Sequence, residues 1–391
     1  MNNFEFVSPT KIYFGKDVDL KVGSCIREKG YHKVLLHYGK SSIFKTGLYE
    51  RITNSLKEND IKFIELGGVE ANPKIDLVRE GVKIVKEEGI DLILAVGGGS
   101  VIDSAKLIGV AATTDYDPWL YSMHEVEVES TIDLMVVLTI SAAGSELSNS
   151  CVISNPEFIL KRGFNSDIIR PKYAFLNPEL TYSVSYHQTG CGIVDILMHT
   201  LERYLVLEED AHLTFNLAEG LMKTVLKEGL VVIENPNDYV ARANLMLASS
   251  LSHNGLTGLG VKMFFTVHKL EHELSGFYDE VPHGAGLSIL FPAWARFLAK
   301  KNPHKLAKFA RNVMGVVNSG DDYQDSLEGI DRIEQYFKQI GMPTRMIDLG
   351  LKNVKFEEMA DSATNFGKNV VFGIENLNKY DIINIYKESY E

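Results

Sequence analysis

The chain has 391 residues, is 45% hydrophobic and carries a formal net charge of −12. Its length allows a large core and suggests two domains. The acidic balance, without any run of Lys or Arg, excludes nucleic acid and anionic membranes as partners. No signal-peptide pattern or bilayer-spanning apolar run is present, and three widely spaced cysteines supply neither a disulfide framework nor a four-thiolate zinc site. We therefore expect a cytoplasmic protein with a small-molecule partner.

The first part of the chain, residues 1–180, alternates β-rich runs with amphipathic helical segments. The strands are predicted at "KVLLHY" (33–38), "IKFIEL" (61–66), "DLILAV" (91–96) and "DLMVVLTI" (133–140). Between the second and third of these, apolar residues recur at helical spacing in "NPKIDLVREGVKIVKEEG". Strand alternating with helix predicts an α/β domain with a mostly parallel sheet.

A glycine-rich turn, "AVGGGSVIDSAK", follows the third predicted strand. Gly97, Gly98 and Gly99 let the backbone approach a ligand closely, and the next helix offers unpaired amides to an anion. The G-x-G-x-x-G fingerprint is absent, so a purely steric turn is the alternative. A second turn, "LTISAAGSE" (138–146), follows the next strand. Two such turns at the carboxyl ends of parallel strands favour a nucleotide cleft.

After residue 180 the pattern becomes helical. The segments that read as helices are 190–206, 211–233, 238–254, 261–276 and 283–300. We therefore expect an all-helical C-terminal domain over residues 181–391.

Within the first of these helices, "CGIVDILMHTLERYL" places Asp195 and His199 four residues apart. Residues at this spacing are neighbours on a helix surface, close enough to hydrogen-bond each other or to share a cation. A satisfied local pair is the alternative to a metal site.

Further histidines lie in "VHKLEHELSGFYDEVPHGAGL". Alone, H-K-L-E-H matches the H-x-x-E-H zinc-protease signature, with His268 and His272 as ligands and Glu271 as base. That interpretation leaves the nucleotide turns and the Asp195/His199 pair unexplained. The other assembly combines that pair with His268 and His283, a donor set that suits zinc or ferrous iron with a position open for substrate.

Taken together, the motifs "GGGSVIDSAK", "AAGSE", "DILMH", "HKLEHEL" and "PHGAGL", in this order and spacing, resemble the iron-containing alcohol dehydrogenase family, and within it the butanol dehydrogenase and broad aldehyde reductase branch. The resemblance covers nearly the whole chain. It implies a Rossmann-like N-terminal domain, a helical C-terminal domain and a site in the cleft between them. It also implies a homodimer that transfers hydride reversibly between NAD(P)H and a short-chain aldehyde or primary alcohol, such as butanal or butanol.

The resemblance also implies roles for individual residues. The ligands of one divalent metal, Fe(II) or Zn(II), would be Asp195, His199, His268 and His283. The coenzyme contacts would be Gly97, Gly98, Gly99, Ser100, Asp103, Thr139, Ser145 and Lys161. His272 falls on a non-ligand histidine near the substrate, and we predict that it relays the alcohol proton. Its alternative role is to orient His268.

The turn after the first predicted strand, "LLHYGKSSIF", predicts coenzyme preference. Proteins that prefer NAD commonly place an acid against the ribose 2′-hydroxyl, whereas this turn holds Gly39, Lys40, Ser41 and Ser42. Lysine and hydroxyl groups can donate to a 2′-phosphate, as can Lys161. We therefore predict that NADP(H) is preferred over NAD(H). The alternative interpretation of the serines is an ordinary helix cap before Ile43.

Two other classes share the expected layout. Lyases resembling dehydroquinate synthase also combine a dinucleotide and a metal in two domains, but the Asp-first ligand set and the lack of a basic cluster argue against them. A catalytically silent nucleotide-binding protein would not need a complete metal set.

Overall fold

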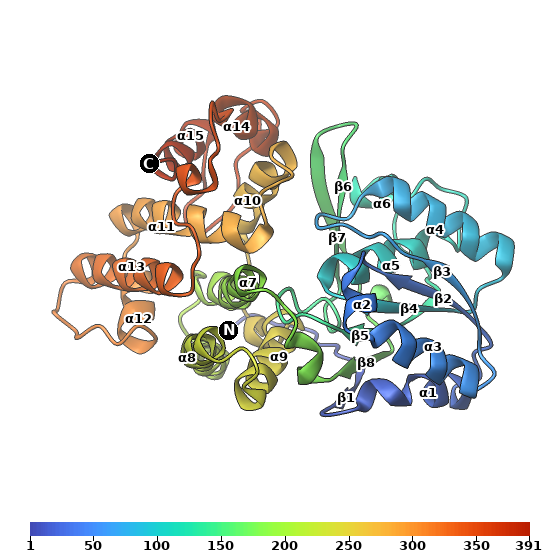
Figure 1. Cartoon of the computed structure of the whole chain (residues 1–391). Coiled ribbons are helices and arrows are strands. Elements are labelled where there is room, and N and C mark those ends of the chain that lie inside the picture. Colours follow the sequence, from blue (N-terminus) through green and yellow to red (C-terminus); the bar gives the residue numbers. More distant parts are fainter. The chain divides into compact units, whose positions relative to one another are not determined.

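The computed structural model describes residues 1–391, which fall into two units (Figure 1). The first, here called the α/β unit, comprises Val7–Val184. The second, the helical unit, comprises Ser185–Glu391 together with the N-terminal segment Met1–Phe6.

The α/β unit is built on a six-stranded sheet in the order β1-β8-β5-β4-β2-β3, in which every neighbouring pair is parallel. The strands are β1 (Lys11–Phe14), β2 (Lys33–Tyr38), β3 (Lys62–Leu66), β4 (Leu92–Gly97), β5 (Asp133–Leu138) and β8 (Tyr173–Leu176). The predicted parallel sheet is confirmed. β2 begins and ends where the sequence pattern predicted, because the continuous run from Val34 to Tyr38 is buried in the sheet.

Helices connect these strands, as parallel crossovers require. They are η1 (Val18–Lys21), α1 (Val22–Glu28), α2 (Ser42–Lys45), α3 (Leu48–Glu58), α4 (Ile75–Glu88), α5 (Gly99–Ala111), α6 (Trp119–Ser122), η2 (Asp167–Ile169) and η3 (Pro178–Thr181). In α4 the residues Ile75, Val78 and Val85 are buried, and Gly89 ends the helix with a positive φ of 62°.

A separate antiparallel hairpin interrupts the alternation. It consists of β6 (Ser150–Asn155) and β7 (Leu160–Asn165), and it extends as a narrow ribbon in Figure 1. This hairpin was not predicted from the sequence, because "SCVISN" is short and the second strand, "LKRGFN", contains charged residues and a glycine.

The helical unit has no strand of its own, which confirms the predicted helical character of this part of the chain. Its helices are α7 (Tyr186–Tyr204), α8 (His212–Glu234), α9 (Tyr239–His253), η4 (Leu256–Gly258), α10 (Thr266–Phe277), α11 (His283–Lys301), α12 (His304–Asn312), α13 (Asp322–Gln339), η5 (Met346–Leu349), α14 (Phe356–Thr364) and α15 (Lys379–Glu388). α10 begins five residues later than predicted, because Phe265 adopts a left-handed conformation with φ of 53°.

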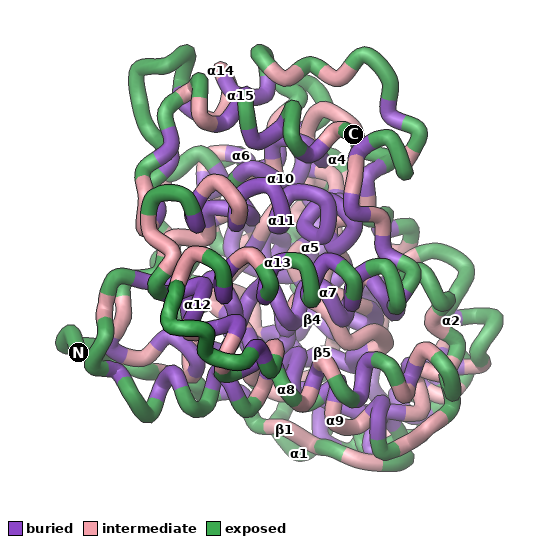
Figure 2. The backbone as a smooth tube through the Cα atoms, turned by 90° about the vertical axis from the view of Figure 1, so that its left-hand side faces the viewer, coloured by how far each residue is buried: buried purple, intermediate pink, exposed green.

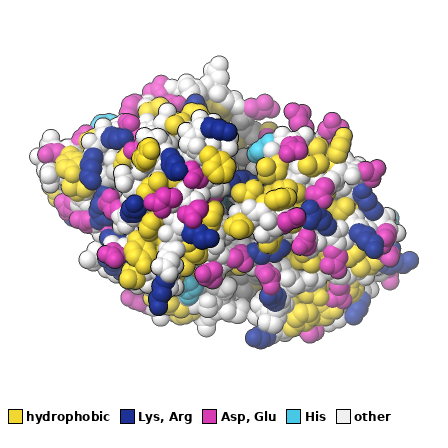
Figure 3. All heavy atoms as spheres, turned by 90° about the horizontal axis from the view of Figure 1, so that it is seen from above, with side chains coloured by type: hydrophobic (Ala, Val, Ile, Leu, Met, Phe, Trp, Pro, Cys, Tyr) yellow, Lys and Arg dark blue, Asp and Glu magenta, His cyan; other side chains and the backbone are white.

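The cores of both units consist of elements that are buried along most of their length. In the helical unit α11 is buried almost throughout, and in the α/β unit the same is true of β4 and β5, as the purple segments of Figure 2 show. No helix combines the length and apolarity needed to cross a membrane. On the face drawn in Figure 3, acidic and basic side chains alternate without a continuous basic region.

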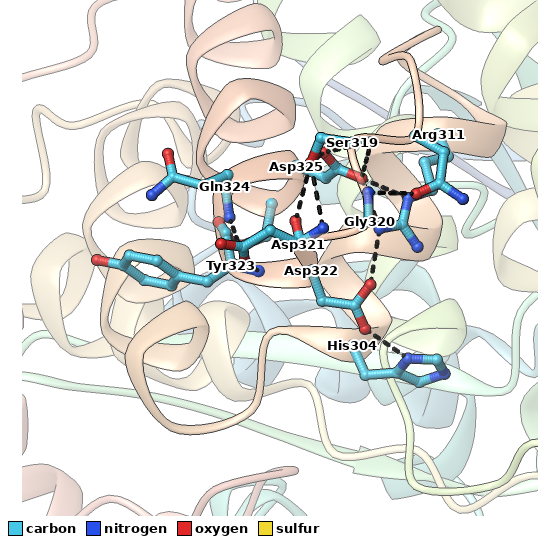
Figure 4. A network of polar contacts seen from close by, with 11 residues as sticks. His304, Arg311, Ser319, Gly320, Asp321, Asp322, Tyr323, Gln324 and Asp325 are labelled. Carbon is cyan, nitrogen blue, oxygen red and sulfur yellow. Dashed lines mark hydrogen bonds and ion pairs between the residues drawn. The ribbon is translucent and has the colours of Figure 1, made fainter.

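A polar network ties α12 to the start of α13 (Figure 4). Asp321 caps α13 by accepting from the amides of Tyr323 and Gln324. Arg311 on α12 donates to Asp322 and Asp325 at 2.7 and 2.6 Å. Every carboxylate in this cluster is thus paired within the protein, and the cluster is structural.

Candidate active site

Helix α7 positions the first two site residues. Ser185 caps it by accepting from the amide of Gln188, and the helix then runs without interruption to Tyr204. Asp195 and His199 therefore lie on one face, with His199 Nδ1 3.5 Å from Asp195 Oδ1, and both side chains are buried. The pair predicted from spacing is present.

Two further helices bring their histidines to the same oxygen. His268 lies in the first turn of α10 and His283 is the first residue of α11. The Nε2 atoms of His268 and His283 each lie 3.7 Å from Oδ1 of Asp195. One carboxylate oxygen thus faces three imidazoles from three helices.

The atoms that face one another in this cluster lack partners. Asp195 Oδ1, His199 Nδ1 and His268 Nε2 are buried and form no hydrogen bond. Buried polar atoms in native proteins are almost always satisfied, so three of them converging on one point require an explanation. A carboxylate and neutral imidazoles are ligands that divalent iron and zinc accept, and the donor set therefore fits such an ion.

Two of these histidines each form a hydrogen bond to a further carboxylate, on the ring nitrogen that faces away from Asp195. Glu202 accepts from Nδ1 of His268 and also from the amides of Val267 and His268, at 2.7 and 3.2 Å. Glu271 accepts from Nδ1 of His283. In metal sites such contacts fix the tautomer and ring orientation of a histidine that binds through its other nitrogen.

Sequence reasoning missed Glu202. It lies three residues after His199 and seven after Asp195, and therefore on the same face of α7, which is the signal that could have identified it. Its partner His268, however, is 66 residues away, and only the fold shows that contact.

The protease alternative fails on geometry. Glu271, its proposed base, is fully buried and its carboxylate is engaged with His283. His268 joins Asp195 and His199 in one group of donor atoms, whereas His272 does not. The ring of His272 lies beside His283, with 5.6 Å between centroids. His272 is therefore near the cluster but outside the set that faces Asp195.

Burial and charge set the protonation of the cluster. Burial, reinforced by His253 and His268, lowers the pKa of His199 well below its ordinary value. For His268, burial acts in the same direction, but the carboxylates of Glu202 and Asp195 outweigh it and raise the pKa to about 9. The acidic side chains thus stabilise positive charge at this cluster.

The glycine turn lies at the carboxyl end of β4. Gly97 pairs with Leu138 of β5, and the amide of Thr139 donates to the carbonyl of Gly97 at 3.1 Å, so the two turns predicted from the sequence lie side by side. A Cβ added at Gly98 would come within 2.3 Å of the Ile140 side chain. Ser100 follows in the first turn of α5. The glycines thus allow close packing of the turns, and α5 presents its N-terminus there.

Asp103 and Ser145 hold these turns together. Ser145 Oγ donates to Oδ1 of Asp103 at 2.5 Å, and the amide of Val152 donates to Oδ2 at 2.9 Å. Burial raises the pKa of Asp103, an effect opposed first by the charge of Lys106 and then by the hydrogen bonds from Ser145 and Val152, with a smaller contribution from Lys161. Both oxygens of Asp103 thus accept hydrogen bonds within the protein, and they hold Ser145 and Val152 in place beside α5.

Lys106 is a buried residue of this region that sequence reasoning missed. Its ammonium donates to the carbonyl and hydroxyl of Ser145, both at 2.8 Å, and to the carbonyls of Ser148 and Ser150 at 3.0 and 2.8 Å. It thereby joins α5 to the segment that leads into β6. Lys161 on β7 is also buried.

The turn after β2 contains an ion pair that the sequence pattern did not reveal. Lys40 Nζ lies 2.5 Å from Oε1 of Glu70, because the loop after β3 runs beside this turn, with the Gly68 amide donating to the Gly39 carbonyl at 2.8 Å. Ser41 precedes the short helix α2 and Ser42 is its first residue, but the Ser41 side chain forms no capping hydrogen bond. The Ser41 hydroxyl is thus not used as a cap.

Comparison with known proteins gives matches along the whole chain. Residues 9–178 match the family model "Iron-containing alcohol dehydrogenase", and residues 189–390 match "Fe-containing alcohol dehydrogenase family, C-terminal". NADH-dependent butanol dehydrogenase A of Clostridium acetobutylicum is 39% identical over 391 residues, covering 100% of both chains. The NADPH-dependent aldehyde reductase of Escherichia coli is 35% identical over 356 residues, covering 90% of each. The crystal structure of NADH-dependent butanol dehydrogenase A from Thermotoga maritima superposes with a TM-score of 0.95 at 34% identity, covering 100% of this chain and 99% of that one.

Proposed function

The chain belongs to the iron-containing alcohol dehydrogenase family, and from this premise we propose that it interconverts short-chain aldehydes and primary alcohols, such as butanal and butanol, at a metal held by Asp195, His199, His268 and His283. It is an oxidoreductase that uses NAD(P)(H) and a divalent metal. The observation that carries the proposed ligand set is the buried, unpartnered Oδ1 of Asp195 facing three imidazoles.

The chain's own groups define what each part contributes. When bound, a divalent metal supplies a Lewis acid that polarises a carbonyl oxygen or favours the alkoxide of an alcohol. The four proposed ligands hold that charge in place, while Glu202 and Glu271 fix the ring orientations of His268 and His283. The turns after β4 and β5 offer the coenzyme a helix N-terminus for its pyrophosphate.

His272 is our proposed proton relay. It lies one turn after His268 on α10, is only half-buried, and its ring is 5.6 Å from that of His283. An imidazole titrates near physiological pH, which suits transfer of the alcohol proton. Replacing His272 with Phe is expected to lower turnover and leave the metal content unchanged. Loss of the metal would instead identify His272 as a ligand.

We propose that NADP(H) is preferred over NAD(H). In support, the turn from Gly39 to Ser42 contains no acid and offers two hydroxyls and a lysine. The Lys40–Glu70 pair places one carboxylate nearby, and named relatives include both NADH- and NADPH-dependent enzymes. The test compares kcat/KM for NADPH and NADH in the parent and in Gly39→Asp. A parent that clearly favours NADH, or an unchanged ratio in the variant, would refute this assignment.

The metal identity, assembly and location complete the proposal. We propose Fe(II) or Zn(II) as the metal, to be decided by elemental analysis of anaerobically prepared protein. We propose a homodimer, to be checked by light scattering. We propose the cytoplasm as the location, which suits three cysteines that are all free thiols.

The activity test is direct. Metal-loaded protein is mixed with NADPH or NADH and butanal, and the near-ultraviolet absorbance of the reduced coenzyme is followed. Coenzyme oxidation that depends on both aldehyde and metal is expected. If neither coenzyme is oxidised with any of a series of short aldehydes, the proposed substrate class is wrong.

A further inference from the structure

An imidazole outside the proposed ligand set, that of His253, lies against one of the proposed metal ligands. The ring of His253 is 4.0 Å from that of His199, centroid to centroid, with 42° between their planes. His199 also stacks on His268, at 4.6 Å and 14°. His253 is not among the residues whose donor atoms converge with Asp195, and its ring lies against that of His199.

His199 differs from the other proposed histidine ligands in how its ring is held. His268 and His283 each donate from Nδ1 to a buried carboxylate, Glu202 and Glu271 respectively. His199 has no such carboxylate, and its Nδ1 is the atom that faces Asp195 without a hydrogen bond. Its backbone carbonyl accepts from the side chain of Arg203, one turn later on α7, at 2.7 Å, a bond that leaves the imidazole ring itself unheld. The plane of the His199 ring is therefore set by the side chains packed against it.

The backbone that carries His253 is well anchored. His253 is the last residue of α9, whose start is capped by Asp238. Directly after it, the buried side chain of Asn254 accepts from the amide of Leu256 at 2.9 Å. The ring of Phe265 lies 6.4 Å from His253 and 6.3 Å from His199, so it flanks both imidazoles. His253 thus presents a fixed ring surface to His199.

We propose that His253 is a positioning residue, whose ring fixes the plane of His199 so that Nδ1 points at Asp195 before metal binds. Through the contact of its tilted ring, it does what Glu202 and Glu271 do by hydrogen bonding for the other two histidines. This inference rests on the proposed function, because it assumes that His199 is a ligand. The packing surface of the His253 ring, and not its nitrogen atoms, orients His199.

The experiment measures metal affinity rather than activity. The full-length protein is freed of metal with a chelator and titrated with Co²⁺ or Zn²⁺ in competition with a chelating indicator. The variants are His253→Phe, which keeps a ring without nitrogen, and His253→Ala, which removes the ring. His32→Ala, at an exposed histidine of the α/β unit, is the matched control, and His199→Ala tests the ligand itself. Thermal unfolding of the metal-free proteins is measured alongside.

We expect His253→Ala to raise the metal Kd about tenfold, the lower end of what loss of a residue supporting a ligand costs. His253→Phe and His32→Ala should stay near the parent value, and the Co²⁺ absorption spectrum should change in His253→Ala but not in these two variants. Parent-like affinity in His253→Ala overturns the inference. A weakened affinity in His253→Phe overturns it too, including when the Ala variant does not fold, because the nitrogen atoms would then be needed. If His199→Ala keeps parent-like affinity, the proposed metal site itself is wrong.

Discussion

Replacing Glu202 with Gln tests how the histidines of the proposed metal site are held. The carboxylate accepts three hydrogen bonds, from Nδ1 of His268 and from the amides of Val267 and His268. Gln keeps the shape but removes the charge. A hydrogen bond to a charged group contributes about 1.5–3 kcal/mol. Since 1.4 kcal/mol corresponds to a tenfold change in Kd, we expect the metal Kd to rise roughly 10- to 100-fold.

The assay is competitive titration of metal-free protein with Zn²⁺. The matched control is Glu219→Gln, because Glu219 is also buried in the helical unit and accepts hydrogen bonds, from Tyr204 and Asn312, without touching a proposed ligand. The control should change stability but not the metal Kd. An unchanged Kd in Glu202→Gln, or an equal increase in both variants, would refute the role assigned to Glu202.

Two predictions concern the α/β unit. Burial lowers the pKa of His37 to about 4, so it stays neutral in the fold, between the Leu66 carbonyl and the Ser104 hydroxyl. The contribution of His37 to the free energy of unfolding is present above about pH 6.5 and is lost as pH falls toward 4. Between pH 7 and pH 5, His37→Gln should therefore lose about 2 kcal/mol less unfolding free energy than the parent loses, as measured with urea. A pH dependence equal to the parent's would contradict this. Lys106→Met removes the cation that acts most strongly on the buried carboxylate of Asp103, and it should lower the unfolding free energy by about 3–5 kcal/mol in the same assay. A loss below about 1 kcal/mol would show that the network is dispensable.

Most of the strands and helices that the sequence predicted are strongly buried, but the edge strand β3 was predicted with only Leu66 buried, and β8 was missed although three of its four residues are buried. β2, β4 and β5 are central strands whose apolar runs are continuous, and the long helices of the second unit carry clear apolar faces. β1 was missed because it is an edge strand of four residues with a partly exposed pattern. β7 was missed because only two of its six residues are buried, and β6 because its buried residues include the polar Ser154 and Asn155 as well as Cys151 and Ile153.

At the candidate site, the proposed ligands could be predicted from local sequence patterns, but the contacts that orient them could not. The spacing of Asp195 and His199 could be read from the helix period, and the histidines of α10 and α11 from motifs. The contacts that orient these side chains join residues far apart in the chain, such as Glu202 with His268 and Lys40 with Glu70. Sequence spacing carries no information about such pairs.

Metal content and coenzyme binding, measured in Asp195→Asn and His283→Ala and compared with the parent, decide whether the four proposed ligands hold a metal. Both variants should lose bound metal and aldehyde reduction together, because Oδ1 of Asp195 faces all three imidazoles. Coenzyme binding should persist, since its proposed contacts lie in the other unit. Full metal occupancy and parent-like turnover in either variant would contradict the four-ligand site.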